Sequence, residues 1–185
     1  YEEREKRVAA RSKVLQNEHR LWEECKQANT ISDYRKYLRF HKKEGHYVAE
    51  AQAAIKLIDE NKLWKVSTLK NTIRAYQNYL KTYPNGQYVN AAIGEISIQK
   101  LINDMLLIEG GTFDMGSNDG WYSDEKPIHK VTLSTYKMAK YPVTQAQWEA
   151  VMGKNPSYFK GDTLPVEMTD WNDAVAFCKE LNRLE

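Results

Sequence analysis

The sequence predicts an α+β protein in which all-α helical-hairpin repeats precede a segment of short strands and helices. Three observations predict this fold class: residues of the first half recur about every 42 positions, the apolar periodicity changes near Asp104, and the net charge changes sign there. Residues 1–103 hold 19 Lys and Arg against 12 Asp and Glu, a net charge of +7, whereas residues 104–185 hold 8 against 13, a net charge of −5. This asymmetry favours two units of different origin.

The repeat rests on thirteen identities between two copies of one unit. Eight pairs are separated by 42 residues and, after a one-residue deletion in the turn, five pairs are separated by 41. The pairs are Leu21/Leu63, Trp22/Trp64, Asn29/Asn71, Thr30/Thr72, Ile31/Ile73, Tyr34/Tyr76, Tyr37/Tyr79, Leu38/Leu80, Gly45/Gly86, Tyr47/Tyr88, Val48/Val89, Ala51/Ala92 and Ile55/Ile96.

Each unit reads as helix, turn, helix. Thr30 followed by Asp33 is typical of a helix start, and the next apolar residues, Tyr34, Tyr37 and Leu38, share one helical face. Gly and Pro mark the turns at residues 41–45 and 83–86. A longer helix is expected from Tyr47 to about Leu69, continuing into the next unit. Its apolar face is made of Val48, Ala51, Ile55 and Ile58.

These hairpins resemble tetratricopeptide-type repeats with a longer period, and we assign residues 21–103 to them. We expect Trp22 and Trp64 to occupy equivalent buried positions, because an aromatic stripe at helical spacing favours core packing over a ligand-binding aromatic cage. Residues 1–20 read as a polar connector helix with a sparse apolar stripe, Val8 and Leu15.

After Asp104 the pattern favours strands. Residues 106–108, the pair Gly110-Gly111 and residues 112–115 predict a strand, a tight turn and a second strand, and residues 131–136 predict a third. Thr144 with Gln147 predicts a capping box that opens a short helix with an apolar face of Trp148, Val151 and Met152.

The last expected elements are a loop and a helix. Residues 153–169 form a long loop with two prolines, a length typical of irregular or functional segments. Asp170 with Asp173 opens the last helix, whose expected apolar stripe is Ala174, Phe177, Cys178 and Leu181.

Seven short motifs in residues 105–185 occur in one order: residues 105–117, 124–127, 131–133, 140–148, 155–159, 164–167 and 171–174. This order resembles the N-terminal half of the formylglycine-generating enzyme family, also called the sulfatase-modifying-factor domain. The resemblance implies a C-type-lectin-like fold with little regular structure over residues 104–185. It does not by itself fix an activity.

The resemblance also implies which metals a complete domain could hold. Full-length relatives oxidise a substrate cysteine with copper held by two cysteines, and those cysteines and the calcium loops lie in the C-terminal half, with which nothing here aligns. We therefore assign no catalytic, cofactor or metal residues in this chain, and copper or calcium only to a complete domain.

The sequence offers two alternative candidate metal sites, one for iron and one for calcium. Other relatives use non-haem iron with histidines from a helical domain, but the histidines here lack ligand-type spacing with a carboxylate: His19, His41, His46 and His129. We expect His41 and His46 to be exposed beside a turn. The acidic loop at 114–125 offers oxygen ligands for calcium, but a solvated acidic loop is favoured: Asp114, Asp119, Asp124 and Glu125.

Composition argues against a membrane protein, a secreted protein and a nucleic-acid-binding protein. No stretch approaches the length of a membrane span, and the charged start is not a secretory signal. Lys and Arg of the first half are interleaved with Glu, which favours a solvated helix face over a nucleic-acid surface. Cys25 and Cys178 have no metal spacing, and we expect both to be buried reduced thiols, in keeping with a cytoplasmic location.

The function prediction is a protein-interaction or ligand-binding module: helical repeats joined to a non-catalytic domain within a larger bacterial-type protein. The alternative is a fragment of an oxidase that makes formylglycine with copper, or of a related non-haem iron enzyme. We expect a protein or peptide partner, no nucleic acid and no membrane. We also expect the missing C-terminal half, or another chain, to cover Trp148, Phe177 and Leu181.

Overall fold

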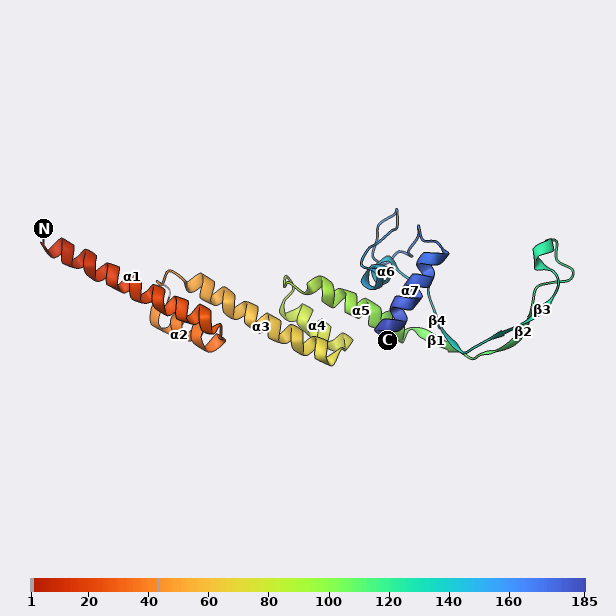
Figure 1. Cartoon of the computed structure of the whole chain (residues 1–185), viewed down its shortest axis with the longest axis horizontal. Helices are drawn as coiled ribbons and strands as arrows, with labels where there is room; N and C mark the ends of the chain where they lie inside the picture. The colour runs from red at the N-terminus through yellow and green to blue at the C-terminus, as the bar shows by residue number, and fades with distance from the viewer. Residues whose placement is uncertain (1, 43) are drawn as a thin grey trace.

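The computed structural model describes residues 2–42 and 44–185, and it consists of a long array of helices followed by a mixed α/β part (Figure 1). The array comprises α1 (Glu2–Ala28), α2 (Ile31–His41), α3 (Val48–Lys70), α4 (Ile73–Thr82) and α5 (Val89–Asn103). The second part comprises β1 (Met105–Ile108), β2 (Gly111–Met115), the 3-10 turn η1 (Ser123–Glu125), β3 (His129–Leu133), β4 (Tyr136–Ala139), α6 (Gln145–Met152) and α7 (Trp171–Leu184).

The repeat is built by short helices that bridge longer ones. The helices α1, α3 and α5 follow one another along the long axis of the molecule, and α2 and α4 lie beside them (Figure 1). Helix α2 packs on both α1 and α3, and α4 packs on both α3 and α5. Helix α3 therefore belongs to two neighbouring hairpins, as the predicted continuation of the helix through Leu63 and Trp64 requires.

The two copies have equivalent cores. The first is formed by Trp22, Cys25, Tyr34, Tyr37 and Ala51, and the second by Tyr76, Tyr79 and Ala92, with Trp64 packed against them. Trp22 stacks on Tyr47 at 5.0 Å between ring centroids, and Trp64 stacks on Tyr88 at 4.8 Å. The prediction of equivalent positions is confirmed, but Trp64 is half-buried whereas Trp22 is 7% exposed.

The starts of the short helices are also repeated. The hydroxyls of Thr30 and Thr72 accept hydrogen bonds from the backbone N–H of Asp33 and Ala75, so each threonine is the N-cap of its helix. Asn71, at the end of α3, adopts the left-handed conformation that a helix C-terminus favours, with φ of 42°. The local sequence therefore specifies where each short helix begins.

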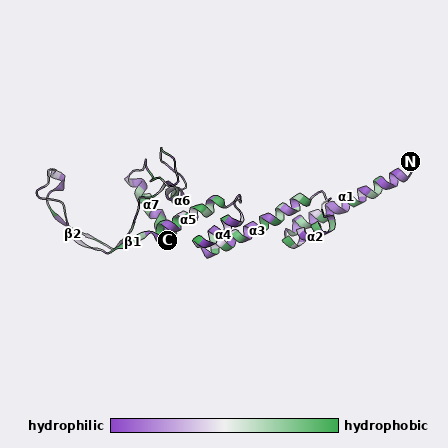
Figure 2. Ribbon diagram, turned by 180° about the vertical axis from the view of Figure 1, so that it is seen from behind, coloured by the Kyte–Doolittle hydropathy of each residue, from purple (hydrophilic) through white to green (hydrophobic). Residues whose placement is uncertain are grey.

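No break separates the expected connector helix from the repeats. Helix α1 runs without interruption from Glu2 to Ala28, and its first half is strongly hydrophilic (Figure 2). Val8 and Leu15, the sparse apolar stripe, are exposed. Glu18 is already part of the first repeat, because it is buried against that hairpin.

The strands pair differently from the prediction. A tight turn at Gly110-Gly111 predicted a hairpin between the first two strands, but β1 pairs with β4, and β2 pairs with β3, both antiparallel. The chain therefore forms one long two-stranded ribbon that is interrupted where the N–H of Gly110 donates to the hydroxyl of Thr135. The expected single strand at 131–136 is split at the same point. Local sequence did not specify this pairing, because partner strands are distant in sequence.

Both predicted capping boxes are present, at Thr144 with Gln147 and at Asp170 with Asp173. The segment between α6 and α7 is irregular, as expected, with an isolated bridge between Thr144 and Pro165. The predicted stripe of the last helix is partly wrong. Phe177 and Leu181 are buried, but Ala174 and Cys178 are exposed, because only one side of α7 packs into the cluster formed with α5 and α6.

Helix α5 joins the two parts of the chain. Its side chains Ile98 and Leu101 form one buried cluster with Trp148 of α6 and with Phe177 and Leu181 of α7. We call this cluster the joint. In this structure α5 of the same chain packs against Trp148, Phe177 and Leu181. The expectation that a missing half or another chain also covers these three side chains stays a prediction. The stacked rings of Trp148 and Phe177 lie 4.8 Å apart at its centre.

Over the described residues, the structure has no helix that combines the length and the apolar character needed to cross a membrane.

Candidate functional site

A buried glutamate fastens each hairpin turn. In the first repeat, Glu18 Oε1 accepts hydrogen bonds from the hydroxyl of Tyr37 at 2.5 Å and from the backbone N–H of His46 at 2.6 Å. The Tyr37 oxygen in turn accepts from the N–H of Tyr47 at 3.0 Å. The second repeat has the same network through Glu60 and Tyr79, with distances of 2.6 Å and, to the N–H of Gln87, 2.7 Å.

The recurring turn glycines belong to this network. A Cβ atom placed on Gly45 would lie 2.7 Å from the hydroxyl of Tyr37 and 3.0 Å from Glu18 Oε1. A Cβ atom on Gly86 would lie even closer to Glu60 Oε1 and to the hydroxyl of Tyr79. Because a side chain at either position would displace the tyrosine–glutamate pair, we interpret the network as structural rather than catalytic.

The first repeat adds two histidines that the second lacks. His41 and His46 both approach Glu18, with Nδ1 atoms 3.9 and 3.3 Å from its carboxylate oxygens. His46 is exposed as expected, but His41 is half-buried and its ring stacks on Tyr37, so that part of the prediction is wrong. Burial alone raises the pKa of Glu18, but the hydrogen bonds from Tyr37 and His46 and the nearby His41 lower it overall.

The tyrosines of the network predict an alkaline transition. Burial and the hydrogen bond to a glutamate raise the pKa of both Tyr37 and Tyr79 to about 12. A raised pKa stabilises the fold below the unfolded pKa of about 10, and this contribution is lost as the pH rises through the folded value. We expect urea midpoints to fall between about pH 10 and about pH 12 more steeply for the wild type than for Tyr37→Phe/Tyr79→Phe. Equal slopes in both proteins would contradict the assignment.

A second polar network holds the irregular loop of the domain. Gln145 is 1% exposed, and its side chain makes four hydrogen bonds. Its Nε2 donates to the carbonyls of Phe159 and Pro165, and its Oε1 accepts from Asn155 Nδ2 and from the N–H of Gly161. Residues of the motifs that carry the family resemblance therefore build the loop scaffold.

Replacing Gln145 with Ala should unravel this loop. The change leaves the carbonyls of Phe159 and Pro165 and two N–H donors without this partner, so we expect a loss of about 2–3 kcal/mol in the stability of the domain. Amide hydrogen exchange of residues 155–167 measures it. Gln16→Ala, at an exposed position of α1, is the control and should leave exchange unchanged. Unchanged protection in Gln145→Ala would show that the network contributes little.

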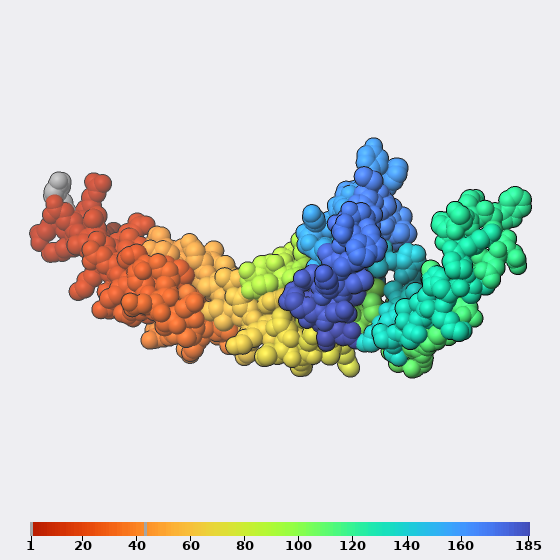
Figure 3. Space-filling view, turned by 45° about the vertical axis from the view of Figure 1, so that its right-hand side comes forward, coloured from red at the N-terminus to blue at the C-terminus, as the bar shows by residue number. Residues whose placement is uncertain are grey.

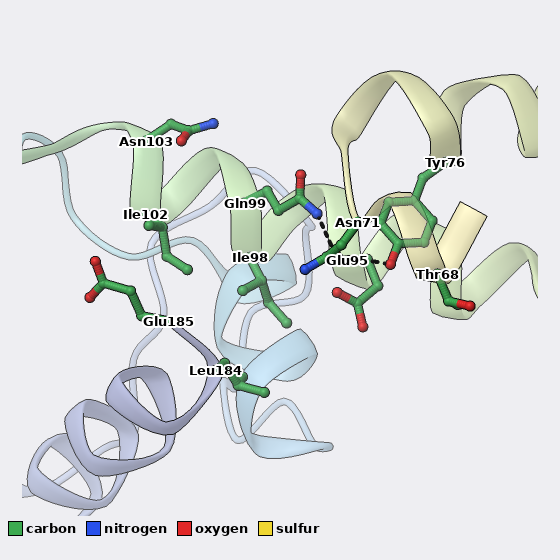
Figure 4. Close-up of a pocket in the computed structure, with 10 residues that line it drawn as sticks. All are labelled: Thr68, Asn71, Tyr76, Glu95, Ile98, Gln99, Ile102, Asn103, Leu184 and Glu185. Atoms are coloured by element: carbon green, nitrogen blue, oxygen red, sulfur yellow. Dashed lines mark hydrogen bonds between the residues drawn. The ribbon is translucent and has the colours of Figure 1, made fainter. Parts of the chain in front are cut away.

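A cleft opens where the second repeat meets the domain. It has a volume of about 520 Å³ and lies between α3, α4, α5 and the end of α7 (Figure 4). On one wall, Asn71 Oδ1 accepts from the hydroxyl of Tyr76 at 3.1 Å and from Gln99 Nε2 at 2.8 Å. The rest of the lining combines apolar and acidic side chains: Ile98, Ile102, Leu184, Glu95 and Glu185.

The domain also presents aromatic side chains to solvent. The ribbon and the α6–α7 part project from the array as two separate lobes (Figure 3). Trp121 at the tip of the ribbon is 99% exposed. Further exposed aromatic side chains lie on the loops and at the start of α7: Tyr122, Tyr141, Tyr158, Phe159 and Trp171. These exposed aromatic side chains are the candidate contact residues of the domain.

The other candidate residues are dispersed. In the acidic loop, Asp114 is paired with Lys130 at 2.9 Å. Among residues 2–42 and 44–185, no group of three His, Cys, Asp or Glu side chains is arranged to hold a metal ion. Cys25 is a buried free thiol as expected, whereas Cys178 is an exposed one.

Sequence reasoning missed Glu18, Glu60, Gln145 and the cleft. Glu18 and Glu60 are separated by the same 42 residues as the other identities, so the repeat alignment carried a signal for them. Gln145 lies one position after a predicted cap and had no separate signal.

The fold defines the class of this protein. An array of helical hairpins shares one helix, α5, with a small mixed α/β domain, and polar side chains hold the irregular loop of that domain. The sulfatase-modifying factor enzyme 1-like domain matches residues 91–185, and the chain belongs to this family. The match begins within α5, in agreement with the packing of that helix in the joint.

Several known proteins are similar to parts of the chain. "Chaperone protein LppX" of Paenibacillus barcinonensis is 47% identical over 76 residues, which are 41% of this chain and 25% of that protein. "Serine/threonine-protein kinase Pkn1" of Chlamydia trachomatis is 42% identical over 62 residues, 34% of this chain and 10% of the kinase. The chain thus spans a quarter or less of these relatives.

Two further similarities are to an enzyme and to a solved structure. "Formylglycine-generating enzyme" of Mycobacterium tuberculosis is 38% identical over 48 residues, 26% of this chain and 16% of the enzyme. The solved structure of "Treponema denticola variable protein 1" matches 43% of this chain and 30% of that chain, with 39% sequence identity and a TM-score of 0.36.

Proposed function

We propose that this chain is a protein-interaction module, in which tetratricopeptide-like repeats carry a non-catalytic domain of the formylglycine-generating type that binds a protein or peptide partner. The observation that carries the proposal is the set of exposed aromatic side chains on the domain, with Tyr158, Phe159 and Trp171 between 69% and 77% exposed. Aromatic residues are enriched in protein interfaces because they contribute a large contact area.

The relatives support this proposal in one respect. Proteins that share the domain are named a chaperone and a protein kinase, and the similar segment is a small part of each. A domain that accompanies different named activities suits a binding role better than one fixed reaction.

The proposal includes the finer architecture. It divides the chain into a connector helix at 1–20, repeats at 21–103 and the N-terminal part of a C-type-lectin-like domain at 104–185, with α5 shared between the last two. It also places the protein in the cytoplasm, a reducing compartment that suits the two free thiols Cys25 and Cys178.

Selection from a displayed peptide library on the immobilised chain tests the binding role. We expect selected peptides to lose at least about tenfold in affinity for Tyr158→Ser/Trp171→Ser. The matched control is Phe40→Ser, which removes an aromatic side chain that is 69% exposed on the repeats. If no peptide is enriched over the bare surface, or if both variants bind alike, the proposal is wrong.

The alternative is a part of an oxidase that converts a substrate cysteine to formylglycine with copper, or of a related non-haem iron enzyme. The similarity to the Mycobacterium tuberculosis enzyme favours it. Under our proposal the chain, incubated with copper, oxygen and a sulfatase-type cysteine peptide, forms no aldehyde. Aldehyde above the protein-free control would support the oxidase instead.

A further inference from the structure

The two repeats differ at the positions that line the cleft. Ala54 and Ile58 of the first repeat correspond, at the 41-residue offset, to Glu95 and Gln99 of the second. Ala54 and Ile58 pack against the core of the first repeat. In the second repeat the polar pair lines an open cleft instead. The cleft is therefore a departure from the repeat's own apolar pattern.

Glu95 has the properties of a binding group. It is half-buried, and within the described residues no Lys, Arg or His lies at ion-pairing distance from it. Its carboxylate lies between the Asn71–Tyr76 pair and the side chains of Ile98 and Leu184 (Figure 4). Burial, and then the charge of Glu95, raise the pKa of Tyr76.

The other residues that line the cleft suit a long side chain with a positively charged end. Ile98 and Ile102 provide an apolar surface beside the carboxylate, and Gln99 adds a carboxamide that is held in place by Asn71. A guanidinium group carries five donors on an aliphatic stem that packs on apolar surface. Glu185, at the rim, is already paired with Lys137, so Glu95 is the carboxylate open to a ligand.

We propose that the cleft at the joint binds an arginine side chain of a peptide ligand, with Glu95 as its carboxylate partner and Ile98 and Ile102 against its stem. This inference deepens the proposed interaction function by naming the chemistry of the partner. It requires only the cleft and not the exposed aromatic side chains of the domain.

The test is a titration of the whole chain with acetyl-arginine amide, followed by two-dimensional amide and side-chain NMR. We expect saturable shifts at Asn71, Tyr76 and Gln99, and no saturation with acetyl-citrulline amide, which has the same shape without the charge. Glu95→Gln should weaken binding at least about tenfold. Glu50→Gln, on the exposed side of α3, is the control and should bind as the wild type does.

A second variant separates binding from folding. Glu95→Ala/Gln99→Ile gives the cleft the residues of the first repeat, which pack there, so it should fold and abolish binding. Tyr158→Ser/Trp171→Ser should bind the probe normally, so loss of the peptide-binding surface and loss of the cleft are distinguishable. Absence of saturable shifts, equal binding of the citrulline probe, or unchanged binding by Glu95→Gln each overturns the proposal.

Discussion

Replacing Trp22 with Ala should destabilise the chain by about 3–5 kcal/mol, the cost of removing a large aromatic side chain from a core. Trp22 is 7% exposed, and it contacts Tyr34, Tyr37 and Tyr47 at centroid distances of 5.0–5.7 Å. Trp64→Ala should cost about half as much, because Trp64 occupies the equivalent position but is only half-buried. Chemical denaturation followed by circular dichroism measures both changes.

Two comparisons make this result interpretable. Phe40→Ala removes an exposed ring from α2 and should change stability by no more than about 0.5 kcal/mol. Repeat arrays can unfold in parts, so amide exchange should show that Trp22→Ala loosens α1 and α2 first. A loss below about 1 kcal/mol for Trp22→Ala would mean that the aromatic stripe serves binding rather than packing.

The contrast between the halves shows which interactions sequence reasoning captures. The hairpin positions, caps and core tyrosines could be predicted because the same local sequence pattern occurs twice at a fixed spacing. The capping boxes at Thr144 and Asp170 are equally local. These features were predicted because the residues that determine them lie within one or two helical turns.

The features that were missed depend on distant partners. The ribbon pairs Leu107 with Lys137 and Phe113 with Val131, and no local pattern specifies that register. The joint depends on α5, which was assigned to the repeats alone although it packs against α6 and α7. The cleft follows from the joint, and its polar residues stand out only when the two repeats are compared position by position.

The expected absence of catalytic residues remains a prediction. What the structure adds is a role for the motif residues themselves. Gln145 and Ser157 are almost fully buried and fasten the loop through its own backbone. These motif residues maintain the fold, and membership of the family can therefore be recognised without any statement about activity.

The packing in the joint predicts which fragments of the chain keep α6 and α7 folded. Residues 104–185 alone lose Ile98 and Leu101, which cover Trp148, Phe177 and Leu181, so we expect α6 and α7 to exchange their amide protons almost without protection. Adding residues 89–103 should restore protection of both helices, because it supplies the missing apolar face. The measurement is hydrogen exchange with mass spectrometry on the two fragments and on the whole chain.

The controls use the same helix and the same fragments. Leu101→Asp in fragment 89–185 should abolish the restored protection, whereas Ile93→Asp, at an exposed position of α5, should not. The ribbon should exchange quickly in every fragment, because only its base, at Met105 and Ala139, packs against the joint and an isolated two-stranded ribbon is marginally stable. Slow exchange of α6 and α7 in fragment 104–185 would show that the domain folds without α5, and that the joint merely connects two independent units.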